Sequence, residues 1–186
     1  MTLTLSDDEK QILLKLARDS ISARFTQTEP PRPPASAALD KVCGAFVTLH
    51  KQGGLRGCIG YVRGIKPLGD SVRDLAAASA FEDPRFPPLQ EAELPELEIE
   101  ISVLSALRRI ADSEEIQVGT HGIMITQDYH SGLLLPQVAT EYGWDRETFL
   151  SHTCGKAGLR RDCWKQRNTI IEIFSALIFS ESKMQQ

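Results

Sequence analysis

One stretch of strict alternation constrains the fold of this 186-residue chain more than any other feature. Within residues 97–103, aliphatic side chains occupy every odd-numbered position and polar side chains every even-numbered one. Successive side chains of a strand point to opposite faces, so this stretch predicts a half-buried strand. One covered face and one wet face are typical of antiparallel sheets, because parallel sheets are usually covered on both faces. We therefore expect an antiparallel sheet.

Helices and strands are interspersed along the rest of the chain. Ser6 and Glu9 form a capping-box pattern ahead of apolar residues at helical spacing, which predicts a helix over about 7–25. The four prolines within residues 28–35 exclude a helix there and predict an extended segment. Further strands are predicted over 44–50, 55–62, 123–126, 132–135 and 169–179, and further helices begin at Pro67, Pro136 and Asp145.

This order of elements predicts an α+β fold, with a mainly antiparallel sheet flanked by helices, rather than a doubly wound α/β fold. The length fits a single domain over residues 1–186, with room for a small second lobe within it.

Composition and local sequence signals restrict the expected partners, location and cofactors of the chain. The formal net charge of −4 argues against broad non-specific binding to nucleic acid, although a local basic pocket stays open. The N-terminus does not resemble a secretory signal, and no apolar run is long enough for a membrane span. The four cysteines show no C-x-x-C spacing, so we interpret them as free thiols in the reducing cytoplasm. The histidines have no metal-site spacing, so we expect this chain alone to bind no metal or other cofactor.

The segment Leu55–Gly60, with the sequence LRGCIG, carries the most informative side chains. On a strand, Arg56 and Cys58 share a face and lie about 6.6 Å apart. A cation beside a thiol favours the nucleophilic thiolate, so the pair indicates a chemical site. Gly57 and Gly60 weaken a strand, and such glycines often mark the close approach of a ligand or another backbone. Alternatively, Cys58 is a small buried apolar residue and the glycines accommodate a crossing strand.

The register of the predicted hairpin decides between these alternatives. If the preceding turn closes as a four-residue loop, Cys58 lies opposite Val47 on an apolar face, which favours a buried thiol. If a bulge shifts the register by one residue, Cys58 faces Thr48 and Arg56 faces His50, which favours a site on a polar face. The sequence leaves both registers open.

Residues outside the hexapeptide offer further candidates. Arg85 either presents its guanidinium to an anionic ligand or pairs with Asp83 in a rigid loop. His121 lies between two glycines on a predicted turn, where a hydrogen-bonded structural role competes with a role in binding. Glu98 and Glu100 fall on the wet face of the predicted strand, so we assign them no acid–base chemistry.

The hexapeptide resembles the signature of the AMMECR domain family, also called protein A of the AmmeMemoRadiSam system. The similarity continues in order through DPRF at 83–86, LEIEISVL at 97–104, HGI at 121–123, LLLPQVA at 133–139, WD at 144–145 and KAGL at 156–159. It covers about residues 7–179, and ordered motifs over such a span are far more specific than any one of them. The resemblance implies a two-lobed α+β fold in which the hexapeptide strand faces a cleft between the lobes.

Relatives in this family are often encoded beside, or fused to, a Memo-type protein and a radical-SAM protein, and the family's activity is not established. The resemblance implies an enzyme or enzyme subunit that acts with those partners in the modification of RNA or another, small anionic, molecule. Cys58 would be a nucleophile or proton donor, and Arg56 would position an anionic group. Substrate binding would involve Gly57, Gly60, Arg85 and His121. The alternative is a non-catalytic module that holds a partner protein, which the lack of an evident base for Cys58 favours.

The stability of an Arg56→Ala variant distinguishes two settings for this side chain. A buried, paired guanidinium predicts a loss of about 3–5 kcal/mol on truncation. A guanidinium that lines an open cleft predicts a change of about 1 kcal/mol or less. We expect the second outcome, because an apolar residue would serve packing better at this position.

Overall fold

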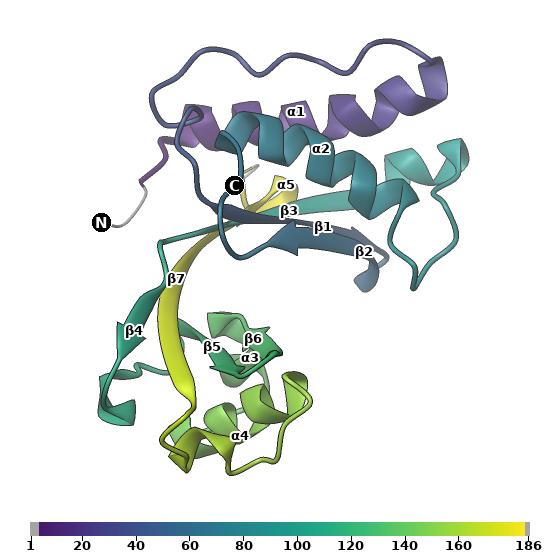
Figure 1. Cartoon of the computed structure of the whole chain (residues 1–186). Coiled ribbons are helices and arrows are strands. Elements are labelled where there is room, and N and C mark those ends of the chain that lie inside the picture. Colours follow the sequence, from purple (N-terminus) through teal and green to yellow (C-terminus); the bar gives the residue numbers. More distant parts are fainter. Residues whose placement is uncertain (1–3, 185–186) are drawn as a thin grey trace. The chain divides into compact units, whose positions relative to one another are not determined.

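The computed structural model describes residues 4–184. Residues up to Leu104 and from Leu177 onward form one compact unit, and Ser105–Ala176 form a second. The elements, labelled in Figure 1 where there is room, are α1 (Asp7–Thr26), β1 (Gly44–Lys51), β2 (Gly54–Tyr61), α2 (Leu68–Phe81), η1 (Glu91–Glu96), β3 (Leu97–Leu104), β4 (Arg108–Ile110), η2 (Ser113–Glu115), β5 (His121–Gln127), β6 (His130–Leu134), α3 (Pro136–Glu141), α4 (Arg146–Lys156), η3 (Cys163–Lys165), β7 (Ile170–Ser180) and α5 (Glu181–Met184).

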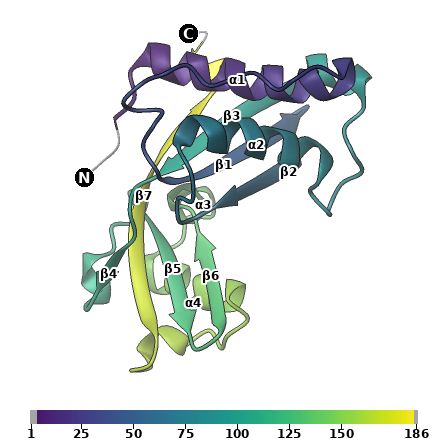
Figure 2. The same ribbon diagram turned by 45° about the horizontal axis from the view of Figure 1, so that its top comes forward.

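The first unit is an antiparallel sheet with one face covered by helices. Strand β1 lies between β2 and β3, and β2 is an edge strand. Helices α1 and α2 lie on the same side of these strands in Figures 1 and 2. The core forms where the helices meet the alternate residues of the strands, including Val47, Leu49, Ile99 and Ile101, which are fully buried. The predicted alternation of β3 is confirmed from Leu97 to Ile101, whereas Ser102, which was expected on the wet face, is buried.

Helix α1 begins where its sequence predicts. The Ser6 hydroxyl accepts a hydrogen bond from the Glu9 N–H, and the Glu9 carboxylate accepts one from the Ser6 N–H. This reciprocal pair satisfies two of the amides that a helix start leaves without partners. The helix ends at Thr26, where Gln27 adopts a left-handed conformation.

The hairpin of β1 and β2 contains a bulge, which is one of the two registers that the sequence leaves open. Gln52 and Gly53 both have positive φ, as in the tight turns that match the twist of a hairpin. Leu49 pairs with Gly57 whereas His50 pairs with Leu55, so Arg56 is the extra residue of β2. A one-residue bulge moves every later side chain of β2 to the opposite face from the one that an unbulged hairpin would give.

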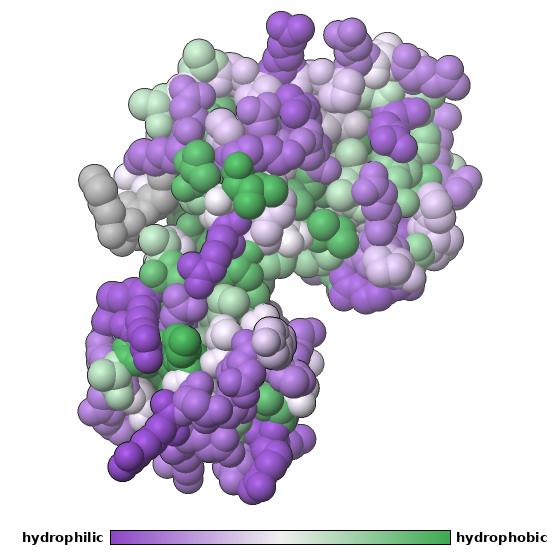
Figure 3. Space-filling view, viewed as in Figure 1, coloured by the Kyte–Doolittle hydropathy of each residue, from purple (hydrophilic) through white to green (hydrophobic). Residues whose placement is uncertain are grey.

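The second unit combines a β5–β6 hairpin with strands β7 and β4. Strand β7 pairs with β5 along one edge and with β4 along the other, and all pairings are antiparallel. The Asp145 carboxylate caps α4 by accepting a hydrogen bond from the Thr148 N–H, as predicted. The unit's face visible in Figure 3 is mostly hydrophilic, with a few apolar side chains among the polar ones.

Two cysteines depart from the sequence-based expectation. Cys154 and Cys163 form a disulfide, so the prediction that all four cysteines are free thiols is wrong for this pair. Cys154 lies in the last turn of α4, and the turn that follows the helix brings Cys163 back so that their Cα atoms lie 6.0 Å apart. The pairing depends on that turn, which spacing alone did not indicate. Cys43 and Cys58 are free and half-buried.

The α+β class and the antiparallel pairing are confirmed. Most predicted elements are present within a few residues of their expected bounds, whereas the three-residue β4 was not predicted. No helix within residues 4–184 has the length and apolar character needed to cross a membrane.

Candidate functional site

Cys58 lies on the polar face of the first sheet. Its cross-strand neighbour is Thr48, and Thr48 in turn lies opposite Glu100 of β3. The three half-buried side chains therefore form a row across β2, β1 and β3, on the face away from the apolar core. The Thr48 hydroxyl donates a hydrogen bond to the Cys58 Sγ atom at 3.3 Å. The structure adopts a bulged register with Cys58 opposite Thr48. The pairing of Arg56 with His50 that was expected for that register is wrong, because Arg56 is itself the bulged residue and His50 pairs with Leu55.

The backbone of Cys58 is held by a loop on the free edge of β2. The buried Asp83 carboxylate accepts a hydrogen bond from the Cys58 N–H at 2.8 Å, and Arg85 Nη2 donates one to the Cys58 carbonyl at 3.1 Å. Arg85 and Asp83 are joined by two further hydrogen bonds, of 2.6 and 2.9 Å. The local Asp83–Arg85 pair predicted from the sequence is thus present, and it supplies the partners that an edge strand otherwise lacks.

The charged side chains of this loop shift each other's pKa values. Hydrogen bonds from the Arg85 side chain, and then from the Cys58 and Arg85 amides, hold the pKa of Asp83 far below its ordinary range despite burial of the carboxyl. The pKa of Arg85 is raised, first by its hydrogen bonds to Asp83 and more weakly by its proximity to the Cys58 thiol. The cation that binds Cys58 directly is therefore Arg85, through the Cys58 carbonyl.

The two glycines of β2 make room for other parts of the chain. A Cβ atom on Gly57 would lie 2.1 Å from the Ser79 carbonyl oxygen of α2, and one on Gly60 would lie 2.3 Å from the Phe46 ring. The Ser79 hydroxyl also bridges the two strands, because it accepts from the Ile59 N–H and donates to the Val47 carbonyl. The close approach predicted for these glycines thus involves α2 and the Phe46 ring.

The Arg56 side chain donates hydrogen bonds to the segment that precedes β3. Its Nε and Nη2 atoms donate to the Glu93 carboxylate at 3.1 and 2.9 Å, and Nη2 also donates to the Pro87 carbonyl. The side chain is 12% exposed, and its guanidinium carbon lies 5.9 Å from the centre of the Phe86 ring. This paired setting differs from the open cleft expected for Arg56. Sequence reasoning overlooked Glu93, and no spacing rule connects it to β2.

His121 belongs to the second unit, apart from the other predicted site residues in sequence and in unit. Its Nδ1 atom accepts a hydrogen bond from the Gln117 N–H at 3.1 Å, which stabilises the turn before β5. The structural role considered for it is therefore present. Within residues 4–184, no three His, Cys, Asp or Glu side chains come close enough together to hold a metal ion.

The chain belongs to the AMMECR1 family, whose model matches residues 14–179. A protein of Methanothermobacter thermautotrophicus is 43% identical over 185 residues, which cover 95% of this chain and 96% of that protein. A protein of Thermococcus onnurineus is also 43% identical, over 95% of this chain and 92% of its own length. The crystal structure of the uncharacterised protein PH0010 from Pyrococcus horikoshii superimposes with a TM-score of 0.89 at 38% identity, covering 97% of this chain and 95% of that one. Membership of a family whose function is uncharacterised does not itself assign a reaction.

Proposed function

We propose that this chain is an enzyme, or a subunit of one, whose reactive group is the Cys58 thiol. The observation that carries the proposal is the set of donors around this half-exposed residue. The Thr48 hydroxyl donates to its sulfur at 3.3 Å, and the Arg85 guanidinium donates to its carbonyl at 3.1 Å. A hydroxyl donor and a cation are the groups that stabilise a thiolate, which is the nucleophilic form of cysteine.

The support of the Cys58 backbone points in the same direction. Both of its polar backbone atoms are bound by the Asp83–Arg85 pair, and the neighbouring Ile59 amide is bound by Ser79. An edge strand needs such backbone partners whatever its side chain is. A reacting sulfur also depends on the fixed position that they give, because misplacement by about 1 Å can cost on the order of a hundredfold in rate.

The other site residues take supporting roles in this proposal. Arg85 stabilises the thiolate, and Arg56 holds the hexapeptide through Glu93 while its Nη1 atom, which has no partner among the described residues, contacts an anionic group. Gly57 and Gly60 let β2 lie close to its neighbours. A substrate contact by His121 and a cleft between two lobes stay predictions from the family resemblance.

The partners of the proposed enzyme are a radical-SAM protein and a Memo-type protein, acting in the cytoplasm on RNA or another anionic molecule. This part rests on the resemblance alone. The competing function is a non-catalytic module that holds a partner protein. It is favoured by the fact that Thr48, whose hydroxyl donates to the sulfur, cannot serve as a general base at neutral pH.

Reconstitution separates the two functions. The purified chain would be mixed with both partner proteins, S-adenosylmethionine, a reductant and RNA, and new modified nucleosides would be measured by mass spectrometry. An enzyme role predicts that product requires the chain and is lost in Cys58→Ser but retained in Cys43→Ser. Product that requires the chain yet survives Cys58→Ser would instead establish the non-catalytic module, and product formed without the chain would remove both.

A further inference from the structure

A pocket of about 670 Å³ lies wholly within the second unit, far in sequence from the Cys58 surface. Strand β4 contributes one side of it through Arg109, and the segment that begins at Trp164 and runs into β7 contributes the rest. Its volume falls within the roughly 300–1,000 Å³ of pockets that bind small molecules. The size alone allows a nucleotide-sized ligand.

All charged residues that line this pocket carry positive charge. Three of the nine lining residues are cationic, namely Arg109, Lys165 and Arg167, and none is acidic. Within residues 4–184, none of the three cations forms an ion pair with a carboxylate. One carboxylate, Glu172, lies opposite Arg109 in the β4–β7 register but does not line the pocket. Such a cluster is unexpected in a chain of net charge −4, and it creates a local field that attracts anions.

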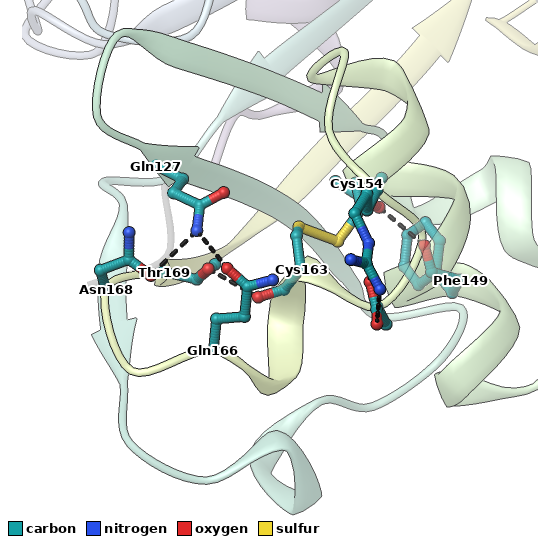
Figure 4. Close-up of a disulfide and its surroundings, with 10 residues drawn as sticks. Gln127, Phe149, Cys154, Cys163, Gln166, Asn168 and Thr169 are labelled. Atoms are coloured by element: carbon teal, nitrogen blue, oxygen red, sulfur yellow. Dashed lines mark hydrogen bonds and ion pairs between the residues drawn. A yellow bond between two sulfur atoms is a disulfide. The ribbon is translucent and has the colours of Figure 1, made fainter.

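The segment that carries two of these cations is fixed at several points (Figure 4). The disulfide joins Cys163 to the end of α4, and the Thr169 hydroxyl donates to the Cys163 carbonyl at 2.6 Å. From β5, the buried Gln127 amide donates to the Gln166 side chain at 2.7 Å and to the Asn168 side chain at 2.9 Å. A segment ordered before binding loses less conformational entropy when a ligand arrives.

Trp164 adds a flat apolar surface beside these charges. Its indole is half-buried, and the Lys165 Nζ atom lies 4.7 Å from the ring centre, which places the ammonium group over the ring. The pocket therefore offers cations for a polyanion and a ring face next to them.

We propose that this pocket binds a phosphate-bearing small molecule. Three cations on a preformed frame match the charge of a diphosphate or triphosphate better than that of a single carboxylate. The volume suits one nucleotide. The proposal concerns the second unit and does not depend on the chemistry assigned to Cys58.

Calorimetric titration of the full chain with pyrophosphate, and separately with ATP, tests this site. We expect both to bind with dissociation constants below about 1 mM, and more weakly as ionic strength rises. Equal affinities would mean that the phosphates alone are recognised, and tighter ATP binding would mean that the nucleoside also contributes. Both results support the site.

Two charge reversals from one segment provide the matched comparison. Arg167→Glu should weaken pyrophosphate binding by at least about tenfold, because it replaces an attracting charge in the pocket by a repelling one. Arg161 is exposed and does not line the pocket, so Arg161→Glu should change the affinity by less than about threefold. Thermal melts would show that both variants are folded. Failure of wild type to bind either compound, binding of RNA oligonucleotides alone, or equal losses in the two variants would overturn the proposal.

Discussion

The Glu93 carboxylate binds two cationic side chains at once. It accepts two hydrogen bonds from Arg56, one from Lys51 and a fourth from the Gln90 N–H. These contacts, with Arg56 first, lower the pKa of Glu93 from 4.5 to about 2. Because the folded-state pKa is depressed, the stabilisation is complete above pH 4.5 and is lost as the pH falls toward 2.

Arg56→Ala tests this linkage. The variant leaves a mostly buried carboxylate with Lys51 and the Gln90 amide, so we expect a loss of about 2–4 kcal/mol in the free energy of unfolding at neutral pH. That loss should shrink as the pH is lowered from 4.5 toward 2, since wild type also loses the charged pair there. Urea unfolding of wild type and variant across this pH range measures the difference in their free energies of unfolding.

Arg108→Ala is the matched control. Arg108 pairs with Glu115 at 2.7 Å, but the two side chains are 58% and 38% exposed. Exposed pairs contribute about 0–1 kcal/mol, so this variant should remain within that range. If Arg56→Ala loses no more free energy of unfolding than the control, Arg56 does not stabilise the fold. The expectation from the sequence, that Arg56 serves binding more than folding, would then be supported.

The sequence predicted part of this site correctly. The hexapeptide contained both the thiol and a cation, and a bulge was one of two registers considered. The roles of Glu93 and Ser79 could not be predicted, because each comes from a different element and reaches β2 through the tertiary fold. The identity of the cation that binds Cys58, Arg85, depends on how the loop after α2 folds back along the edge of β2.

At the scale of secondary structure elements, the contact of α2 with β2 requires a residue without a side chain. Gly57→Ala would place a Cβ atom 2.1 Å from the backbone oxygen of Ser79, so helix and strand would have to move apart. Overpacking of this kind costs about 1–3 kcal/mol. We expect the free energy of unfolding, measured by thermal or urea unfolding, to fall by that amount. We also expect the environment of the neighbouring Cys58 side chain to change.

Gly155→Ala is the corresponding control within a helix. Gly155 lies in α4, and an added Cβ atom would meet no atom within 4 Å. Replacing a helical glycine with alanine stabilises by about 0.5–1 kcal/mol. Opposite signs for the two substitutions are predicted, and a Gly57→Ala variant as stable as wild type would mean that α2 does not constrain β2.

For the whole molecule, periodicity and capping patterns were sufficient to predict the α+β class and most elements. Strand β7 was found from its β-branched and aromatic residues, although its side chains do not alternate strictly. The short β4 was missed because three residues carry no measurable period. The disulfide was missed because the intracellular setting inferred from composition argued for thiols, while the turn after α4 brings together two cysteines that are nine residues apart in sequence.

If the fold positions Cys58 as a reactive thiol, as we propose, the Cys58 thiol should be alkylated quickly in the native protein. Cys43 is a suitable internal reference, because it is also free and half-buried and because burial raises the pKa of its thiol. Native protein would be treated with iodoacetamide at pH 7, and each site would be followed by peptide mass. We predict that Cys58 reacts at least about tenfold faster than Cys43, and that Thr48→Val slows Cys58 alone. A Cys58 that reacts no faster than Cys43 would contradict the account.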